Sequence, residues 1–152
     1  MSEINFFVKK FNELSIDELY EILRLRTEIF VVEQDCVYQD LDNKDQKALH
    51  VIGVKEGNIV AYTRLFDAGA YFDNASLGRV IVAADQRKFS YGHQLIEESL
   101  KAIKRFYATD TITISAQLYL KKFYEKHGFL QKGDTYLEDG IPHIKMIRSL
   151  QN

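Results

Sequence analysis

Hydrophobic residues near the N-terminus first alternate as in a strand and then recur every three or four residues as in a helix. Residues 4–11 are predicted to form a strand. Ser15 and Glu18 have the spacing of a capping box, so a helix begins there. Arg26 falls within the apolar stripe of this helix. A buried guanidinium needs a partner, so Arg26 is either a buried ion-pair partner or part of a pocket wall that contacts a substrate.

An acidic segment follows this helix and runs to about residue 47. Loops of this length inside a compact domain are often functional. Residues 49–54 and 59–65 are rich in β-branched and aromatic side chains and flank a turn at 56–58, which predicts a hairpin. A further strand is predicted at 76–83. Its continuous apolar end is typical of a strand buried on both faces, in the middle of a sheet.

The C-terminal half alternates between strand and helix patterns. A polar, basic loop at 85–91 precedes a predicted helix over residues 92–106, and a strand is expected at 111–115. A short helix over 118–126 ends before Gly128. Residues 129–130 and 135–137 are predicted to be extended, and a final strand covers 143–147. These elements together predict a mixed α/β fold.

Composition limits the class of protein. The chain has 152 residues, of which 46% are hydrophobic and 28% charged, so a single folded domain over 1–152 is expected. The net charge of -2 provides no general attraction for nucleic acid or an anionic membrane. No apolar run is long enough for a membrane helix, and no secretory signal is visible. With one cysteine, Cys36, and no metal-ligand spacing, a cytoplasmic protein without a metal is expected.

The segment over residues 80–95 has the pattern of an anion-binding site. A buried strand leads into a loop with Arg87 and Lys88, and a helix then begins beside Gly92. Free backbone N–H groups and the positive end of the dipole attract phosphates to a helix N-terminus. The spacing matches neither the dinucleotide-binding glycine motif nor the nucleoside-triphosphate loop. The pattern therefore indicates a pyrophosphate site of another kind.

Residues 87–92 resemble the R-x-x-G-x-G/A acyl-CoA loop of the GNAT family of N-acetyltransferases, with Ser90 in place of the first glycine. A serine fits there if its backbone is not left-handed. Residues 117–129 resemble that family's N-x-x-A-x-x-x-Y-x-x-x-G-F segment, with Gln117 for the asparagine and Tyr124 at the tyrosine. Nearly the whole chain is similar to the ElaA-like branch. The resemblance implies a mostly antiparallel sheet, splayed at its middle strands and flanked by about four helices.

The resemblance also implies a role for individual residues toward acetyl-CoA, the expected cosubstrate. The pantetheine arm would lie along the backbone of a strand and accept a hydrogen bond from Gln117. The strand residues are Val80, Ile81 and Val82. The groups expected around the pyrophosphate, mainly through main-chain N–H groups, are Arg87, Lys88, Ser90, Tyr91, Gly92 and His93. Tyr124 would donate its proton to the departing thiolate.

A general base is needed because an ammonium group must lose a proton before it attacks a thioester. Many relatives carry a glutamate on the central strand, where this chain has Gly78 and Arg79, so that role does not transfer. Glu33 and His143 are the candidates, the first acting through a water and the second as a group that titrates near neutral pH. The residues expected to contact the acceptor are Arg26, Glu33, Gln34 and His143.

These observations favour an enzyme that moves acetyl from acetyl-CoA directly to an amine. Carboxylates between Glu33 and Asp45 suggest a cationic acceptor. The alternative is a non-catalytic acyl-CoA sensor that keeps the phosphate loop but lacks a base. A nucleic-acid partner is not expected, since the exposed cations of the second helix are few. We expect a monomer or a homodimer.

Overall fold

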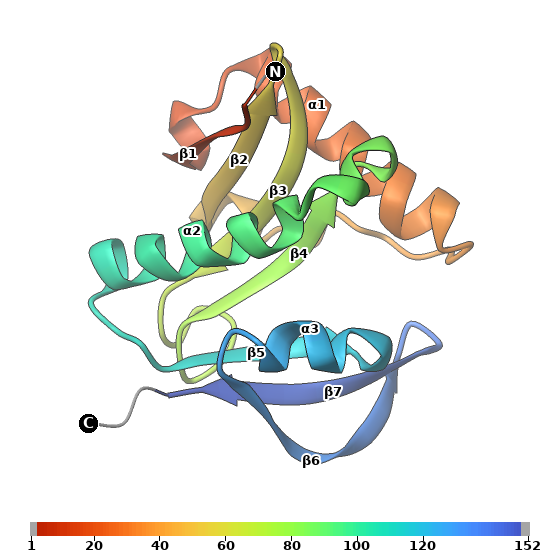
Figure 1. Ribbon diagram of the computed structural model, residues 1–152, viewed down its shortest axis with the longest axis vertical. Helices are drawn as coiled ribbons and strands as arrows, with labels where there is room; N and C mark the ends of the chain where they lie inside the picture. Colours follow the sequence, from red (N-terminus) through yellow and green to blue (C-terminus); the bar gives the residue numbers. More distant parts are fainter. Residues whose placement is uncertain (1–2, 150–152) are drawn as a thin grey trace.

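The computed structural model describes residues 3–149. Residues 1, 2 and 150–152 lie outside the described part of the chain. The two ends of the predicted domain over 1–152, and the first residues of the segment in which no secretory signal was visible, therefore also lie outside it. The described chain folds into two antiparallel sheets with helices packed on them (Figure 1). The mixed α/β arrangement is the predicted one.

The first sheet has the order β1-β2-β3-β4, with every neighbouring pair antiparallel. Its strands are β1 (Asn5–Lys10), β2 (Leu49–Lys55), β3 (Asn58–Phe66) and β4 (Ser76–Val82). Tyr62 pairs with Ile81 and Arg64 with Gly78, so two residues of β4 lie opposite one residue of β3. This is a β-bulge, and it includes Arg79, whose φ is 53°.

The second sheet has the order β5-β7-β6 and is formed by the C-terminal part of the chain. Its strands are β5 (Ile112–Gln117), β6 (Phe129–Glu138) and β7 (Ile141–Arg148). The two short extended pieces predicted within 129–137 are one strand instead. The register of β6 shifts between Lys132 and Tyr136, where Gly133 has a φ of 82°. The polar residues at this irregularity hid the continuity of the strand.

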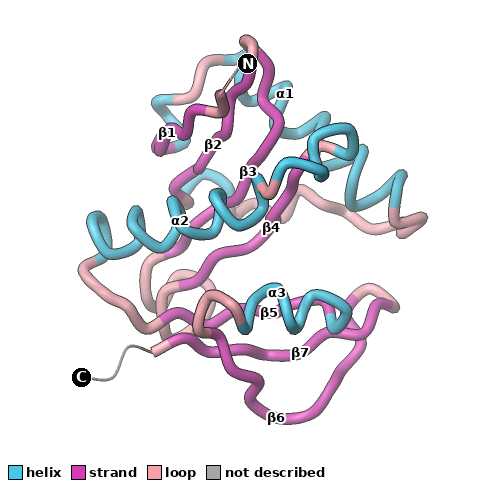
Figure 2. Tube along the Cα trace, viewed as in Figure 1, coloured by secondary structure: helices cyan, strands magenta, loops and turns pink. Residues whose placement is uncertain are grey.

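β4 and β5 start side by side and then diverge, as Figure 2 shows. The described residues contain a single bridge between them, from Ala75 to Ile112, where Thr113 N–H donates to the Ala75 carbonyl at 2.9 Å. β4 therefore lies in the middle of the molecule but at the edge of its own sheet. Val80 and Val82 are only partly buried, which corrects the expectation of a strand covered on both faces.

Helices cover both faces of the first sheet. The α-helices of the chain are α1 (Ile16–Thr27), α2 (Tyr91–Tyr107) and α3 (Lys121–Glu125), and α1 continues into a π-helical segment (Glu28–Glu33). α1 and α2 pack on the first sheet, whereas α3 contacts β6 of the second sheet. Ser15 and Glu18 form the predicted capping box of α1. α1 packs on the face of the sheet that carries Ile52 and Tyr62, and α2 packs on the face that carries Val51 and Leu65. No helix of residues 3–149 is long and apolar enough to span a membrane.

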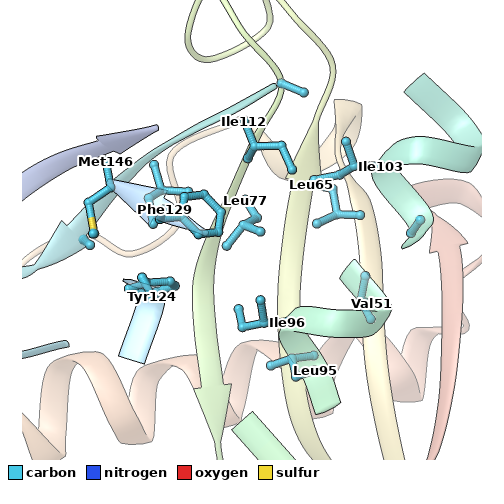
Figure 3. Packing of buried hydrophobic residues seen from close by; sticks show 14 of the residues in the cluster. Val51, Leu65, Leu77, Leu95, Ile96, Ile103, Ile112, Tyr124, Phe129 and Met146 are labelled. Carbon is cyan, nitrogen blue, oxygen red and sulfur yellow. The ribbon is translucent and has the colours of Figure 1, made fainter. Parts of the chain in front are cut away.

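One hydrophobic core joins the two sheets on the α2 side. Leu77 of β4 lies between Leu65 of the first sheet and Phe129 of the second (Figure 3). Leu95 and Ile96 of α2 are completely buried in the same cluster. This packing holds the two sheets together. The two strands β4 and β5 meet at the bridge between Ala75 and Ile112 and separate beyond it.

Candidate functional site

A cavity of about 580 Å³ lies between the diverging strands β4 and β5. It runs from the N-terminus of α2 to the turn between β6 and β7. The predicted site residues that line it are Glu33, Gln34, Val80, Ile81, Val82, Arg87, Lys88, Ser90, Gly92, His93, Gln117, Tyr124 and His143. Arg26 and Tyr91 are the predicted residues that do not line it. The fold thus brings most of the predicted residues to one place.

The phosphate end of the cavity, Arg87 to His93, is the N-terminal approach to α2. The first N–H groups of a helix have no partner within the helix, so the start of this 17-residue helix offers donors and the positive end of its dipole. A Cβ added to Gly92 would stand 3.4 Å from the Phe123 ring and 3.9 Å from Val82, in the space between the strands. The missing side chain therefore keeps this passage open.

Ser90 adopts the left-handed conformation, with φ 54° and ψ 21°. The sequence allowed a serine here only if its backbone was not left-handed, so this condition is not met. A left-handed backbone costs a non-glycine residue roughly 1–2 kcal/mol because Cβ crowds the carbonyl oxygen. The position therefore has the geometry of a glycine site occupied by serine, and the strain lies directly at the phosphate end.

Tyr91 points away from the cavity. Its side chain is buried, its ring centroid lies 5.3 Å from that of Phe89, and Lys55 Nζ lies 5.2 Å from its centroid. The side chain packs the start of α2 against the first sheet. With this orientation, Tyr91 could contact the pyrophosphate only through its main-chain N–H group and not through its side chain.

His93 pairs with His127 beyond the cavity wall. His93 Nδ1 and His127 Nε2 are 2.8 Å apart, and both rings pack against Phe123. Partial burial and the neighbouring His93 lower the pKa of His127. The pair holds α2 and the end of α3 together beside the phosphate end.

Arg26 is completely buried in α1 and does not reach the cavity. Its Nε donates to Asp40 Oδ2 at 2.8 Å, and its Nη1 donates to Asp45 Oδ1 at 2.7 Å. Arg26 is therefore the buried ion-pair partner, and the predicted contact with an acceptor is not found. Both partners belong to the acidic loop, which this arginine fastens to the fold.

Two further arginines complete this buried network. Arg64 of β3 is bound to Asp42 at 2.6 Å and to Asp45 at 3.0 Å. Arg79 of the bulge contacts Asp40 Oδ1 at 2.7 Å and donates from Nη2 to the Asp40 carbonyl at 2.9 Å. Asp40, Asp42 and Asp45, three of the carboxylates that suggested a cationic acceptor, are thus paired within the protein, whereas Asp35 is exposed.

These ion pairs also change the acidity of the loop. Burial alone would raise the pKa of Asp45, but its hydrogen bond to Arg26 and the charges of Arg26 and Arg64 outweigh burial and lower it. Burial lowers the pKa of the neighbouring His50, whose Nε2 lies 2.9 Å from the Asp45 carbonyl. Asp45 is therefore charged and His50 is neutral at pH 7.

Tyr124 lies on α3 where the cavity meets the core. Its ring is 5% exposed and contacts Phe123 and Phe129. Burial raises the pKa of Tyr124 well above its usual value. The phenol is therefore neutral at pH 7 and carries a proton, and the same burial makes it a weaker acid than a free phenol.

The far end of the cavity is built from the π-helical segment after α1, from β5 and from the β6–β7 turn. Glu33 Oε2 is 2.8 Å from Arg87 Nη2, so this carboxylate already has a charged partner at the phosphate end. The amides of Gln34 and Gln117 face each other across the gap at 3.2 Å. The contact of Glu33 links the π-helical segment after α1 to the loop after β4, and the contact of Gln34 links the end of the same segment to β5.

His143 lies on β7, and its side chain is 8% exposed. Its Nδ1 is 2.7 Å from the Ile141 carbonyl, which only accepts, so Nδ1 carries a proton and donates. Its Nε2 faces Glu138 Oε2 at 3.4 Å. These two contacts hold the ring with Nε2 toward the carboxylate of Glu138.

The sequence analysis did not single out Glu138, Ser115, Cys36 or Asp139, which also line the cavity. Ser115 Oγ donates to Glu138 Oε1 at 3.1 Å, and Cys36 Sγ donates to the Asp139 carbonyl at 3.3 Å. The two adjacent carboxylates Glu138 and Asp139, just before the predicted final strand, were the signal available in the sequence. Within residues 3–149, no three His, Cys, Asp or Glu side chains form a metal-binding group.

Comparison with known proteins places this architecture in a family. The sequence model of the acetyltransferase (GNAT) domain matches residues 16–150. A UPF0039 protein of Schizosaccharomyces pombe is 41% identical over 148 residues, covering 96% of this chain and 97% of its own length. The crystal structure of an acyl-CoA N-acyltransferase from Pseudomonas aeruginosa is 38% identical, has a TM-score of 0.91, and covers 97% of this chain and 100% of its own. That of Escherichia coli ElaA is 36% identical with a TM-score of 0.90 and the same coverages. The chain is a member of the GNAT acetyltransferase family, close to ElaA.

Proposed function

We propose that this protein is an N-acetyltransferase that moves the acetyl group of acetyl-CoA directly to an amine. The observation that carries the proposal is the single cavity that opens to a helix N-terminus at one end and to His143 at the other, with Tyr124 between them on α3. The similar Pseudomonas protein is described as an acyl-CoA N-acyltransferase.

The donor would lie with its diphosphate at the phosphate end and its pantetheine arm between β4 and β5. Backbone groups of β4 that lack a partner strand on this side are suited to bind the arm as an added strand. Gln117 would give up its hydrogen bond with Gln34 and form one with the pantetheine arm. The arm, once bound between the strands, would place the thioester near Tyr124.

The reaction needs two proton transfers. The amine nitrogen attacks the thioester carbonyl carbon, the carbon–sulfur bond breaks, and the sulfur leaves with the electron pair. Tyr124 gives its phenolic proton to that sulfur, and the proton lost by the amine passes to Nε2 of His143. General acid and base groups of this kind contribute about 10²–10⁴-fold each.

We assign the base to His143 rather than to Glu33. Glu33 is engaged by the charged Arg87 at 2.8 Å, whereas His143 lines the cavity and its Nε2 lies 3.4 Å from Glu138 Oε2. A carboxylate near Nε2 stabilises the imidazolium that forms when the amine is deprotonated.

Calorimetric titration with acetyl-CoA and with CoA, followed by thiol release with a panel of amines, tests the proposal. We expect micromolar binding and release with some amine. Tyr124→Phe should lower kcat by about 10²-fold or more and leave the Kd for acetyl-CoA unchanged. A sensor would bind acetyl-CoA without release by either protein, and absence of binding would refute both functions.

A further inference from the structure

We infer that the site selects a cationic amine that carries no carboxylate, and that Glu138 binds its ammonium group. The inference rests on the proposed function and concerns the acceptor end of the cavity. This end is formed by Cys36, Tyr38, Arg79, Glu138, Asp139 and His143. The selectivity of this end for an acceptor depends on which of its charged side chains are not already paired within the protein.

Arg79 is the cation at the acceptor end, and its charge is already neutralised. Asp40 receives it at 2.7 Å through the side chain and at 2.9 Å through the carbonyl, and Asp42 lies 3.7 Å away. The side chain is 18% exposed. Turning it toward a substrate carboxylate would take one of its two arginine partners from the buried Asp40, which is unfavourable.

The rest of the network offers no replacement. Arg26 and Arg64 are both at most 1% exposed and are held by the aspartates of the acidic loop. Three arginines, Arg26, Arg64 and Arg79, face three aspartates, Asp40, Asp42 and Asp45, so the cluster is neutral. Among the described residues that line the acceptor end, the one basic side chain of the Lys or Arg type is Arg79, and it is already paired with Asp40.

The carboxylate of Glu138 is different because it remains accessible. Its side chain is 44% exposed, and its contacts in this structure are a hydroxyl and an imidazole rather than a Lys or Arg. Ser115 orients Oε1, which leaves Oε2 toward Nε2 of His143 at 3.4 Å. An ammonium group bound to Oε2 would stand beside the base that takes its proton.

A carboxylate on the same carbon as the amine would meet repulsion at this position. It would lie within a few ångströms of Glu138, and Asp139 follows in the same turn. Like charges at such distances in a partly enclosed site disfavour binding strongly. The acceptor end is therefore complementary to a decarboxylated amine and opposed to the parent amino acid.

Three matched pairs of substrates test the selectivity: tyramine with tyrosine, histamine with histidine, and agmatine with arginine. We expect kcat/KM for CoA release to be at least tenfold higher for the amine of each pair. Equal values, or a preference for the amino acids, would overturn the inference and leave the proposed function intact. Release with no member of any pair, despite binding of acetyl-CoA, would count against the proposed function and this inference together.

The variant Glu138→Gln tests the residue. It should raise KM for the preferred amine at least tenfold, reduce the preference over the amino acid, and keep the Kd for acetyl-CoA. Glu125→Gln, on the exposed side of α3 and outside the cavity, is the matched control and should behave as the unmodified protein. An unchanged KM and pair ratio in Glu138→Gln would show that another group binds the ammonium.

Discussion

The two ends of the cavity are built in opposite ways. The phosphate end comes from one continuous segment, residues 87–93, in which a short loop after β4 leads into α2. The acceptor end combines residues that meet only in the folded protein: Cys36, Tyr38, Arg79, Glu138, Asp139 and His143. One end depends on backbone N–H groups, whose direction follows from local structure. The other depends on side chains whose charges are decided by distant partners.

The difference explains why the acidic loop misleads when it is considered alone. Asp40, Asp42 and Asp45 look like free charges in the sequence, yet Arg26, Arg64 and Arg79 neutralise them. The accessible carboxylates of the acceptor end are those of Glu138, the last residue of β6, and Asp139, about a hundred residues later in the chain. Proximity in sequence is therefore a reliable guide at the phosphate end and a poor one at the acceptor end.

The largest effect is expected from breaking the network that supports the acceptor end. Arg26→Ala leaves Asp40 and Asp45 buried with one partner fewer, so the free energy of unfolding should fall by about 3–5 kcal/mol. Urea denaturation measures this. Arg24→Ala, which removes an exposed pair with Glu28, is the control and should cost about 0.5 kcal/mol or less. A similar small loss for Arg26→Ala would show that the network does not hold the loop.

The next effect concerns the chemistry of the acceptor end. His143→Gln should lower kcat by about 10²-fold while the Kd for acetyl-CoA stays constant, because the base is lost and the phosphate end is untouched. Steady-state CoA release and calorimetry measure the two quantities. Glu33→Gln provides the contrast and should retain most of kcat, since Arg87 already engages Glu33. The reverse pattern would move the base to Glu33.

The buried ion pairs also predict a pH dependence of stability. Because Asp45 has a lowered pKa in the folded protein, its contribution is complete above its usual value of 3.8 and is lost as the pH falls below it. The free energy of unfolding should then decrease by up to about 1.4 kcal/mol per pH unit for each such carboxylate. Urea denaturation from pH 4 down to pH 2 should show a shallower slope for Asp45→Asn. Asp73→Asn, at an exposed position, should keep the original slope.

The smallest effect is expected at the phosphate end. Ser90→Gly relieves a left-handed serine and should stabilise the fold by about 1 kcal/mol, partly offset by the entropy of glycine in the unfolded chain. It should also tighten binding of CoA, because the backbone can approach the diphosphate more closely. Thermal denaturation and calorimetry measure the two changes. Looser binding would mean that the Ser90 hydroxyl itself contacts the phosphates.

Most of the secondary structure, the family and the strand–loop–helix segment around Gly92 could be predicted from the sequence, whereas the continuity of β6 and the exposure of β4 could not. Period-two and helical patterns, the Ser15 capping box and the glycine beside the start of α2 are local features, and local sequence specifies them. Only the tertiary structure decided whether Arg26 is a partner or a pocket wall, that Ser90 is left-handed, and that Glu138 stands beside His143. The physical reason is that burial and long-range pairing set whether a charge is free, and these depend on where the fold brings distant segments together.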